Sequence, residues 1–332
     1  MVTMFALMAV GFILRKKKLL PENAGTVIAK MLTYVIAPAL ALKSQITNCS
    51  IEALTQNIEL PLFGLILVLV AIGIAYPLSK LFIRNHKDSP ELTYQQNIYK
   101  YALAFANYGY VGDFLIIGIF SEQGGIDSTQ YFQYTIFKFF LNILCYGWGL
   151  YVLIPKDKGD GVLKNLKKGL LTPPMIAVLL GIVLGLLNVR EIVPQGIMTP
   201  IMNVLDNAGK CQGISMVLAG FVVGSYSFKE MILNKKVYLA SLMRLIVIPS
   251  AMLGIFALIN SSIVQNVINF QISDTVILFT LFAFAAPLGL NTIVYPATYG
   301  GDTKTGAAMT MISSVLAIIT LPLMYLLFVV IL

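Results

Sequence analysis

The chain has 332 residues, of which 58% are hydrophobic and only 11% are charged. About a quarter of the residues of a soluble domain are charged, so this composition indicates a protein that lies mainly in lipid. The formal net charge of +8 is distributed over several short loops, which argues against a nucleic-acid partner.

Long apolar stretches recur along the whole chain. A helix needs roughly 17–25 apolar residues to cross the hydrocarbon core of a membrane. We predict ten such helices, spans one to ten, at residues 1–14, 24–43, 59–82, 98–120, 129–154, 171–189, 197–225, 237–260, 275–299 and 306–331. The sequence therefore predicts an all-α, multi-pass membrane protein without a soluble domain.

The charged residues of the loops predict the orientation of the chain. The odd-numbered loops and their flanks carry most of the basic residues: Arg15, Lys16, Lys17, Lys18, Lys80, Arg84, Lys87, Lys100, Lys156, Lys158, Lys164, Lys167, Lys168, Lys229, Lys235, Lys236, Arg244 and Lys304. The even-numbered loops and flanks hold only Lys43 and Arg190 beside the acidic residues Glu52, Glu59, Glu122, Asp127, Glu191 and Asp274. Cytoplasmic loops are the basic ones, so we expect both termini on the non-cytoplasmic side of the plasma (inner) membrane.

Three segments of the first half recur in the second half in the same order. The pairs are Gly11–Pro21 with Gly185–Pro194, Tyr34–Ala41 with Met216–Val223, and Ala104–Gly109 with Ala283–Gly289. Chance similarity between apolar helices is the alternative explanation. Each half has an odd number of spans, so the second half would be inverted, as in many secondary transporters. We predict an N-terminal five-helix repeat at 1–155, a cytoplasmic linker at 156–170 and an inverted five-helix repeat at 171–332.

The fourth and ninth spans contain residues that interrupt helices. Pro287 has no amide hydrogen and its ring clashes with the preceding turn, while Gly109 and Gly112 lower helix propensity. Interrupted helices at matching places in two repeats indicate a binding site, and their free amide groups suit an anion. We predict a substrate site in which Asn107 and Asn291 bond the substrate, with Tyr108, Gly109, Gly112, Pro287 and Gly289 around it. Two ordinary kinked helices packed through glycine are the alternative.

Asn107-x-Gly109-x-x-Gly112 resembles the Asn-x-Gly-Phe-x-Gly signature of the auxin efflux carrier family. Further similar landmarks are Gly11–Lys16, Ala37–Ala39, Ala286–Pro287, Asn291 and Tyr299–Gly300. The family includes the plant PIN-type auxin exporters and bacterial malate and malonate carriers, and the resemblance covers nearly the whole chain.

The resemblance implies ten helices in two inverted repeats, with helices four and nine broken and crossing. It also implies a scaffold of helices one, two, six and seven, a moving transport domain made from the rest, and a homodimer formed through the scaffold. The implied substrates are small organic acids. The sequence departs from the family pattern at Phe114, where a proline is usual, so the break in span four would depend on Gly109 and Gly112.

Two pairs of charged residues lie inside predicted spans, where charges are costly and usually functional or paired. Asp113 and Lys138 have similar predicted depths. One hypothesis is that they pair and relay a proton or cation during transport. The alternatives are a static buried pair, or a Lys138 that binds the substrate carboxylate directly. Asp206 and Lys210 have the i,i+4 spacing of one helix face, which predicts a self-neutralising pair or a second-tier lining of the cavity. Lys43 is expected to extend to the membrane interface.

These features together predict a secondary transporter of small organic anions, such as malate, malonate or auxin-like acids, that works by elevator-type alternating access. H⁺ or Na⁺ is a possible coupling ion. The alternatives are a sodium- or proton-coupled symporter of another substrate class that uses Asp113, and a membrane receptor or sensor. One histidine and three cysteines do not predict a metal site, and without a Gly-x-Ser-x-Gly or His-Glu-x-x-His motif no enzyme is expected. We expect no cofactor. The expected partners are the substrate and membrane lipid.

Overall fold

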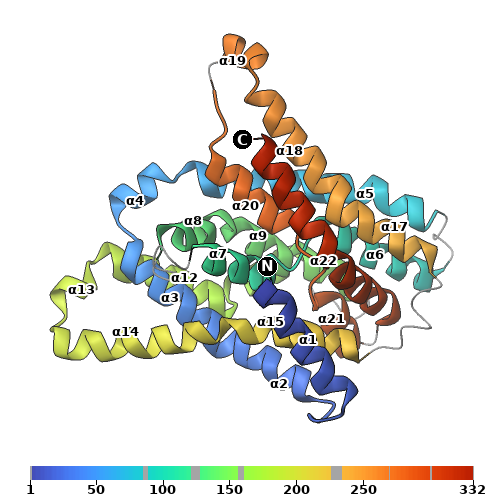
Figure 1. Ribbon diagram of the computed structural model, residues 1–332, viewed down its shortest axis with the longest axis horizontal. Coiled ribbons are helices and arrows are strands. Elements are labelled where there is room, and N and C mark those ends of the chain that lie inside the picture. Colours follow the sequence, from blue (N-terminus) through green and yellow to red (C-terminus); the bar gives the residue numbers. More distant parts are fainter. Residues whose placement is uncertain are drawn as a thin grey trace. The chain divides into compact units, whose positions relative to one another are not determined.

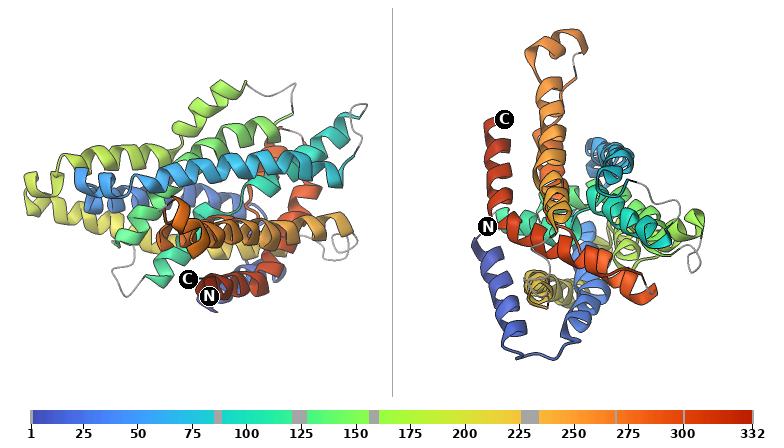
Figure 2. Two further views of the ribbon diagram at one scale, coloured as in Figure 1. Left: turned by 90° about the horizontal axis from the view of Figure 1, so that it is seen from above. Right: turned by 90° about the vertical axis from the view of Figure 1, so that its right-hand side faces the viewer.

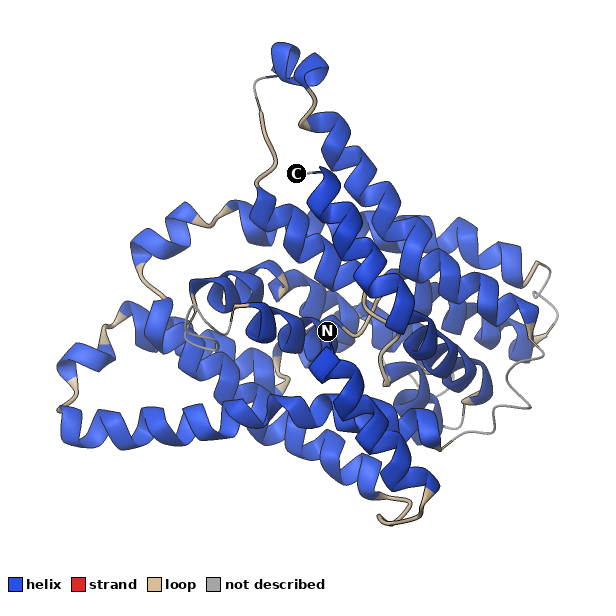
Figure 3. Cartoon of the chain, in the orientation of Figure 1, coloured by secondary structure: helices blue, strands red, loops and turns tan. Residues whose placement is uncertain are grey.

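The computed structural model describes residues 2–84, 89–120, 128–155, 161–225, 234–268, 270–299 and 301–331. Every regular element within these ranges is a helix (Figure 3). Several residues used for the predictions lie outside the described residues: Lys87, Glu122, Asp127, Lys156, Lys158, Lys229 and Gly300.

The described helices support a multi-pass membrane protein. By length and composition, five segments can cross a membrane: Ala24–Asn48, Glu59–Phe82, Pro90–Ile119, Lys235–Ile259 and Lys304–Val330. Two further pairs of helices, each bent at a short break, raise the number to seven if each pair counts as one span. The pairs are Thr129–Phe137 with Phe139–Leu153, bent by 41°, and Val162–Leu170 with Pro173–Leu186, bent by 56°. The predicted spans one, seven and nine are shorter or interrupted in the described residues, so the total of ten remains a prediction.

The chain divides into two compact units, and each contains segments of both predicted repeats. Unit 1 comprises Met1–Gly64, Tyr110–Gly147 and Leu166–Ser225, and unit 2 comprises Leu65–Gly109, Trp148–Asn165 and Tyr226–Leu332. The chain passes from one unit to the other inside α5 (Glu59–Phe82), η2 (Tyr108–Gly112) and α11 (Val162–Leu170). The units follow contacts rather than chain order, so they do not test the predicted repeat boundaries.

Unit 1 is built from α1 (Val2–Lys16), α2 (Ala24–Met31), η1 (Leu32–Ile36), α3 (Ala37–Asn48), α4 (Ile51–Gln56), α7 (Asp113–Ile119), α8 (Thr129–Phe137), α9 (Phe139–Tyr146), α12 (Pro173–Leu186), α13 (Val189–Ile192), α14 (Gln195–Lys210), η5 (Cys211–Gly213) and α15 (Ile214–Gly224). Two of its helix pairs pack closely through glycine, α1 with α15 (Figure 1) and α3 with α12. A Cβ atom on Gly11 would overlap the carbonyl of Val217, and one on Gly185 would lie 2.8 Å from the Cβ of Cys49. Small residues allow membrane helices to approach in this way.

Unit 2 is built from most of α5 together with α6 (Pro90–Ala104), α10 (Trp148–Leu153), α17 (Lys235–Leu242), η6 (Met243–Val247), α18 (Ile248–Ile259), α19 (Ser262–Ile268), α20 (Asp274–Phe284), α21 (Asn291–Tyr299) and α22 (Lys304–Ile331). The run from α17 through η6 to α18 is continuous and leads into α19, as Figures 1 and 2 show.

Two helices of π type precede proline, one in each unit. η1 ends just before Ala37-Pro38, and η6 ends just before Ile248-Pro249. Because proline has no amide hydrogen and its ring clashes with the turn before it, the turn widens to the i→i+5 pattern of a π-helix. The amide groups of Ala37 and Ile248 accordingly donate to the carbonyls of Leu32 and Met243. The widened turn in η6 contains Arg244.

Candidate functional site

Spans four and nine are both interrupted within unit 2. α6 ends at Ala104, and Phe105 is extended, with φ −121° and ψ 139°. α20 ends at Phe284, and the helix resumes as α21 at Asn291. The interruption in span nine contains Pro287, as predicted. The interruption in span four begins before the two glycines instead of at them, and Gly109 and Gly112 lie in the following π-helix η2.

The two interruptions touch each other. The amide of Asn107 donates a hydrogen bond of 2.8 Å to the carbonyl of Pro287. A Cβ atom on Gly289 would lie 3.7 Å from the Cα, Cβ and Cγ atoms of Asn107, so Gly289 faces Asn107. The long-range bond takes the Asn107 amide out of the helical ladder, which explains why α6 stops before its glycines.

Polar side chains satisfy the interrupted backbone of span nine. The amide of Leu288 donates to the Oγ of Ser313 at 3.0 Å. The hydroxyl groups of Thr292 and Thr310 both donate to the carbonyl of Gly289 at 3.3 Å. Non-helical backbone at membrane depth needs such partners. The sequence reasoning missed these residues, although the hydroxyl residues of α22 lie within an otherwise apolar span.

Asn291 is held by a tyrosine of span four. Its Nδ2 donates to the hydroxyl oxygen of Tyr101 at 2.8 Å. Tyr101 is buried and lies on the last turn of α6 before the interruption. The structure thus brings Asn107, Pro287, Gly289 and Asn291 into one neighbourhood of unit 2.

The three remaining predicted residues, Tyr108, Gly109 and Gly112, have different surroundings. Tyr108 is buried. A Cβ atom added to Gly109 would meet no atom of the described residues within 4 Å. Gly112 belongs to unit 1 and directly precedes α7 as its N-cap residue.

Asp113 and Lys138 form a buried ion pair in unit 1. Their side chains are 5% and 8% exposed. Lys138 is the residue at which α8 and α9 meet, where the helix bends by 41°. Its ammonium group also lies 5.6 Å and 5.1 Å from the ring centres of Tyr131 and Tyr134. The contact between the two charges is therefore observed, whereas their role in transport remains a prediction.

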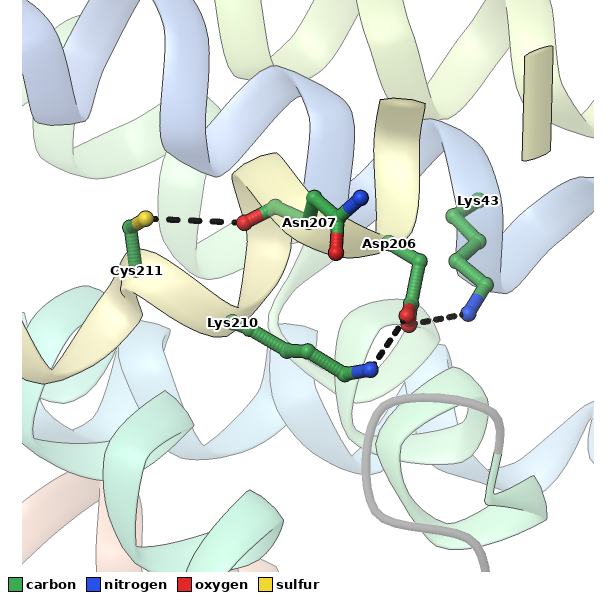
Figure 4. A network of polar contacts seen from close by, with 5 residues as sticks. All are labelled: Lys43, Asp206, Asn207, Lys210 and Cys211. Atoms are coloured by element: carbon green, nitrogen blue, oxygen red, sulfur yellow. Dashed lines mark hydrogen bonds and ion pairs between the residues drawn. The ribbon is translucent and has the colours of Figure 1, made fainter. Parts of the chain in front are cut away.

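Asp206 accepts hydrogen bonds from two lysines in unit 1 (Figure 4). The Nζ atoms of Lys43 and Lys210 each lie 2.5 Å from one of its carboxylate oxygens. The side chain of Lys210 is 66% exposed and that of Lys43 only 7%. The prediction that Lys43 extends to the membrane interface is wrong, because α3 continues to Asn48 and the lysine turns inward to Asp206.

The charged network of Asp206 borders an open cavity of about 470 Å³ in unit 1. Lys43, Thr47, Arg190, Met202, Asn203 and Asp206 line the cavity. Lys210 was expected to line a second-tier cavity together with Asp206. It binds the Asp206 carboxylate without being among the lining residues.

Arg244 is a candidate that the sequence reasoning missed. It was assigned to the basic flank of loop seven, but it is only 1% exposed and lies within the helical run Lys235–Ile259. Its guanidinium carbon lies 5.8 Å from the centre of the Phe284 ring. None of its three side-chain nitrogens has a hydrogen-bond partner among the described residues. A charge inside a predicted span was the signal that could have singled it out.

The described residues contain no group of three or more His, Cys, Asp or Glu side chains that could hold a metal ion.

A family model described as membrane transport protein matches residues 1–325. No curated protein matches the sequence.

Proposed function

The chain belongs to the membrane transport protein family, the family of the auxin efflux carriers, and on that premise we propose that it is a secondary transporter of small organic anions. Members of the family are transporters rather than enzymes. The proposed substrates are carboxylates of the size of malate, malonate or indole acids.

The observation that carries this proposal is the junction of the two interrupted spans in unit 2. Asn107 and Pro287 share a backbone hydrogen bond there, and Asn291 is fixed by Tyr101. Amide side chains beside interrupted helices can bond a carboxylate without adding a fixed charge. The proposed roles are substrate bonding by Asn107 and Asn291, and shaping of the backbone by Gly109, Gly112, Pro287 and Gly289, next to Tyr108.

An elevator movement is the proposed mechanism. Unit 1 contains spans one, two, six and seven, which the resemblance assigns to the scaffold, and unit 2 contains spans eight, nine and ten. The second part of span four and most of span five also fall in unit 1, although the resemblance assigns them to the moving domain. The glycine-mediated packing of α1 with α15 and of α3 with α12 supports a rigid scaffold, through which we propose that two copies dimerise.

Uptake into proteoliposomes tests the proposal. Labelled malate, malonate and indole-3-acetate are supplied under proton and sodium gradients of either direction. We expect saturable uptake of at least one acid, which Asn107→Ala and Asn291→Ala reduce about tenfold or more, as expected for lost bonds to a charged group. Asn266→Ala, an exposed position in α19, is the matched control. The absence of transport of all these acids by the folded wild-type protein would contradict the proposal.

Ion-coupled symport of another substrate class is the second candidate, and the buried Asp113–Lys138 pair favours it. A carboxylate and an ammonium group in the membrane can exchange a proton or a cation during a transport cycle. This candidate predicts strict sodium or proton dependence that Asp113→Asn abolishes. Uptake near the wild-type level in both Asp113→Asn and Lys138→Met would remove the pair from the mechanism.

A further inference from the structure

Arg244 is a buried cation whose hydrogen-bonding groups have no partner in the protein. Its Nε, Nη1 and Nη2 atoms make no hydrogen bond with the described residues, although the residue is only 1% exposed to solvent. Burying a charge without a hydrogen-bonded counter-charge costs several kcal/mol. Contact with the face of the Phe284 ring offsets part of this cost, but it satisfies none of the guanidinium N–H groups.

The described part of unit 2 offers Arg244 no carboxylate. Its acidic residues are Glu91, Asp274 and Asp302. Glu91 and Asp274 are exposed, and Asp302 accepts hydrogen bonds from the Lys304 amide and the Thr305 hydroxyl. None of the three forms an ion pair with Arg244. In unit 1, by contrast, Lys138 is neutralised by Asp113.

A second unsatisfied group lies on the same helical run as Arg244. Ser241 is fully buried, and its hydroxyl has no hydrogen-bond partner among the described residues. It precedes Arg244 by three residues, which places both side chains near one face of the run. The two residues together place one cation and one hydroxyl group, both without hydrogen-bond partners among the described residues, near one face of the helical run.

The position of Arg244 connects it to the interrupted spans. Phe284, the ring under the guanidinium, is the last residue of α20 before the interruption of span nine. The π-helix η6, which contains Arg244, packs against α6. α6 carries Tyr101, whose hydroxyl holds the side chain of Asn291. All of these residues belong to unit 2.

We propose that Arg244 binds the carboxylate of the transported acid through its guanidinium fork, with the Ser241 hydroxyl donating a further hydrogen bond. The inference rests on the function proposed above and adds the residue that selects for a negative charge. The planar guanidinium matches a carboxylate with two parallel N–H···O bonds, which a lysine cannot reproduce. An ester or amide of the same acid lacks the charge and is rejected.

The test uses the full-length protein in proteoliposomes and in detergent. We compare four proteins: wild type, Arg244→Gln, Arg244→Lys and the control Arg84→Gln, which changes an exposed arginine. Each is assayed with the acid that the wild type transports, malate, malonate or indole-3-acetate, and with the methyl ester of that acid in which every carboxyl group is esterified. We expect KM for the acid to rise about 10- to 100-fold in Arg244→Gln and the preference for acid over ester to disappear. Arg244→Lys recovers only part of the affinity, and Arg84→Gln behaves as wild type.

Thermal unfolding separates binding from a structural role. The substrate-free Arg244→Gln protein should melt at the wild-type temperature or above, because an unpaired buried charge has been removed. The acid should raise the melting temperature of the wild type and not that of the variant. A lower melting temperature of the substrate-free variant with an unchanged KM would show a structural arginine and overturn the inference.

The outcomes keep the two proposals distinguishable. If the folded wild-type protein transports no organic acid, the proposed function itself is contradicted. If the wild type transports an acid, and Arg244→Gln has the same KM and the same preference for acid over ester, only the proposed role of Arg244 is contradicted. If Arg244→Gln does not fold, Arg244→Lys decides, because it keeps the charge and loses the fork. Wild-type affinity in that variant contradicts bidentate binding.

Discussion

At the scale of single residues, the buried charges differ in how they are neutralised. Asp113 and Lys138 neutralise each other in a buried pair, Asp206 is shared by Lys43 and Lys210, and Arg244 has no counter-charge in the described residues. Removing one member of a buried pair leaves the other charge buried alone, which is more costly than removing both.

The first prediction concerns the stability that depends on the Asp113–Lys138 pair. Asp113→Asn or Lys138→Met alone should lower the free energy of unfolding by about 3–5 kcal/mol, and the double variant should lose less than either single one. Lys210→Met is the control, since its side chain is 66% exposed and exposed pairs contribute at most about 1 kcal/mol. Unfolding curves in detergent measure the effect, and purely additive losses would contradict it.

The second prediction concerns the hydroxyl group that holds Asn291. Tyr101→Phe removes the acceptor of the Asn291 amide and should reduce transport severalfold while costing about 0.5–1.5 kcal/mol of stability. Tyr94→Phe is a matched control on the same helix, because it loses a comparable bond to the Leu153 carbonyl. Uptake assays and melting curves of both variants decide. Equal uptake by the two would place Asn291 outside the substrate site.

At the scale of helices, local chemistry could be predicted from the sequence and long-range contacts could not. The i,i+4 spacing predicts the contact of Asp206 with Lys210, and Pro287 predicts an interruption at its own position. The interruption in span four depends on the bond between Asn107 and Pro287, which joins residues far apart in sequence. The interruption therefore begins after Ala104, several residues before the predicted position at Gly109 and Gly112.

The two misassigned cations have the same kind of cause. Lys43 was placed at a helix end because the predicted span stops there, whereas α3 continues to Asn48. Arg244 was placed in a loop flank because basic residues usually lie there. It is instead buried in η6, the widened turn that precedes Pro249. Neither environment is encoded in the residues next to the lysine or the arginine.

The third prediction concerns the close packing of α1 against α15. A Cβ atom on Gly220 would overlap the carbonyl of Met8, so Gly220→Leu should destabilise the protein by about 1–3 kcal/mol or more through overpacking. Gly254→Leu in α18 is the control, because a Cβ atom there meets nothing within 4 Å among the described residues. Melting temperatures in detergent compare the two variants. A larger loss in Gly254→Leu would contradict the role of glycine at this contact.

At the scale of the whole molecule, the glycine contacts follow the order expected of an inverted repeat. Span one packs on span seven through Gly11, and span six packs on span two through Gly185. The predicted repeat equates span one with six, span two with seven, and Gly11 with Gly185. The two contacts therefore exchange with each other under the proposed symmetry, which supports the repeat that the sequence similarity predicts.

The fourth prediction concerns orientation in the plasma (inner) membrane. In a variant whose native cysteines are replaced by serine, Glu52→Cys should react with a membrane-impermeant maleimide in intact cells. Lys17→Cys should react only after permeabilisation, because the basic loops are expected to be cytoplasmic. Both positions are exposed, so burial does not limit the reaction. The reverse labelling pattern would invert the proposed topology, with both termini inside.

The measurement that tests the central claim most directly is counterflow in proteoliposomes loaded with an unlabelled organic acid. The account predicts transient accumulation of the labelled acid by wild type and by Asn266→Ala. It predicts none by a variant carrying both Asn107→Ala and Asn291→Ala, with all three proteins equally folded. Full counterflow by the doubly substituted protein, or none by wild type with any of the carboxylates, would contradict an organic-anion site at the interrupted spans.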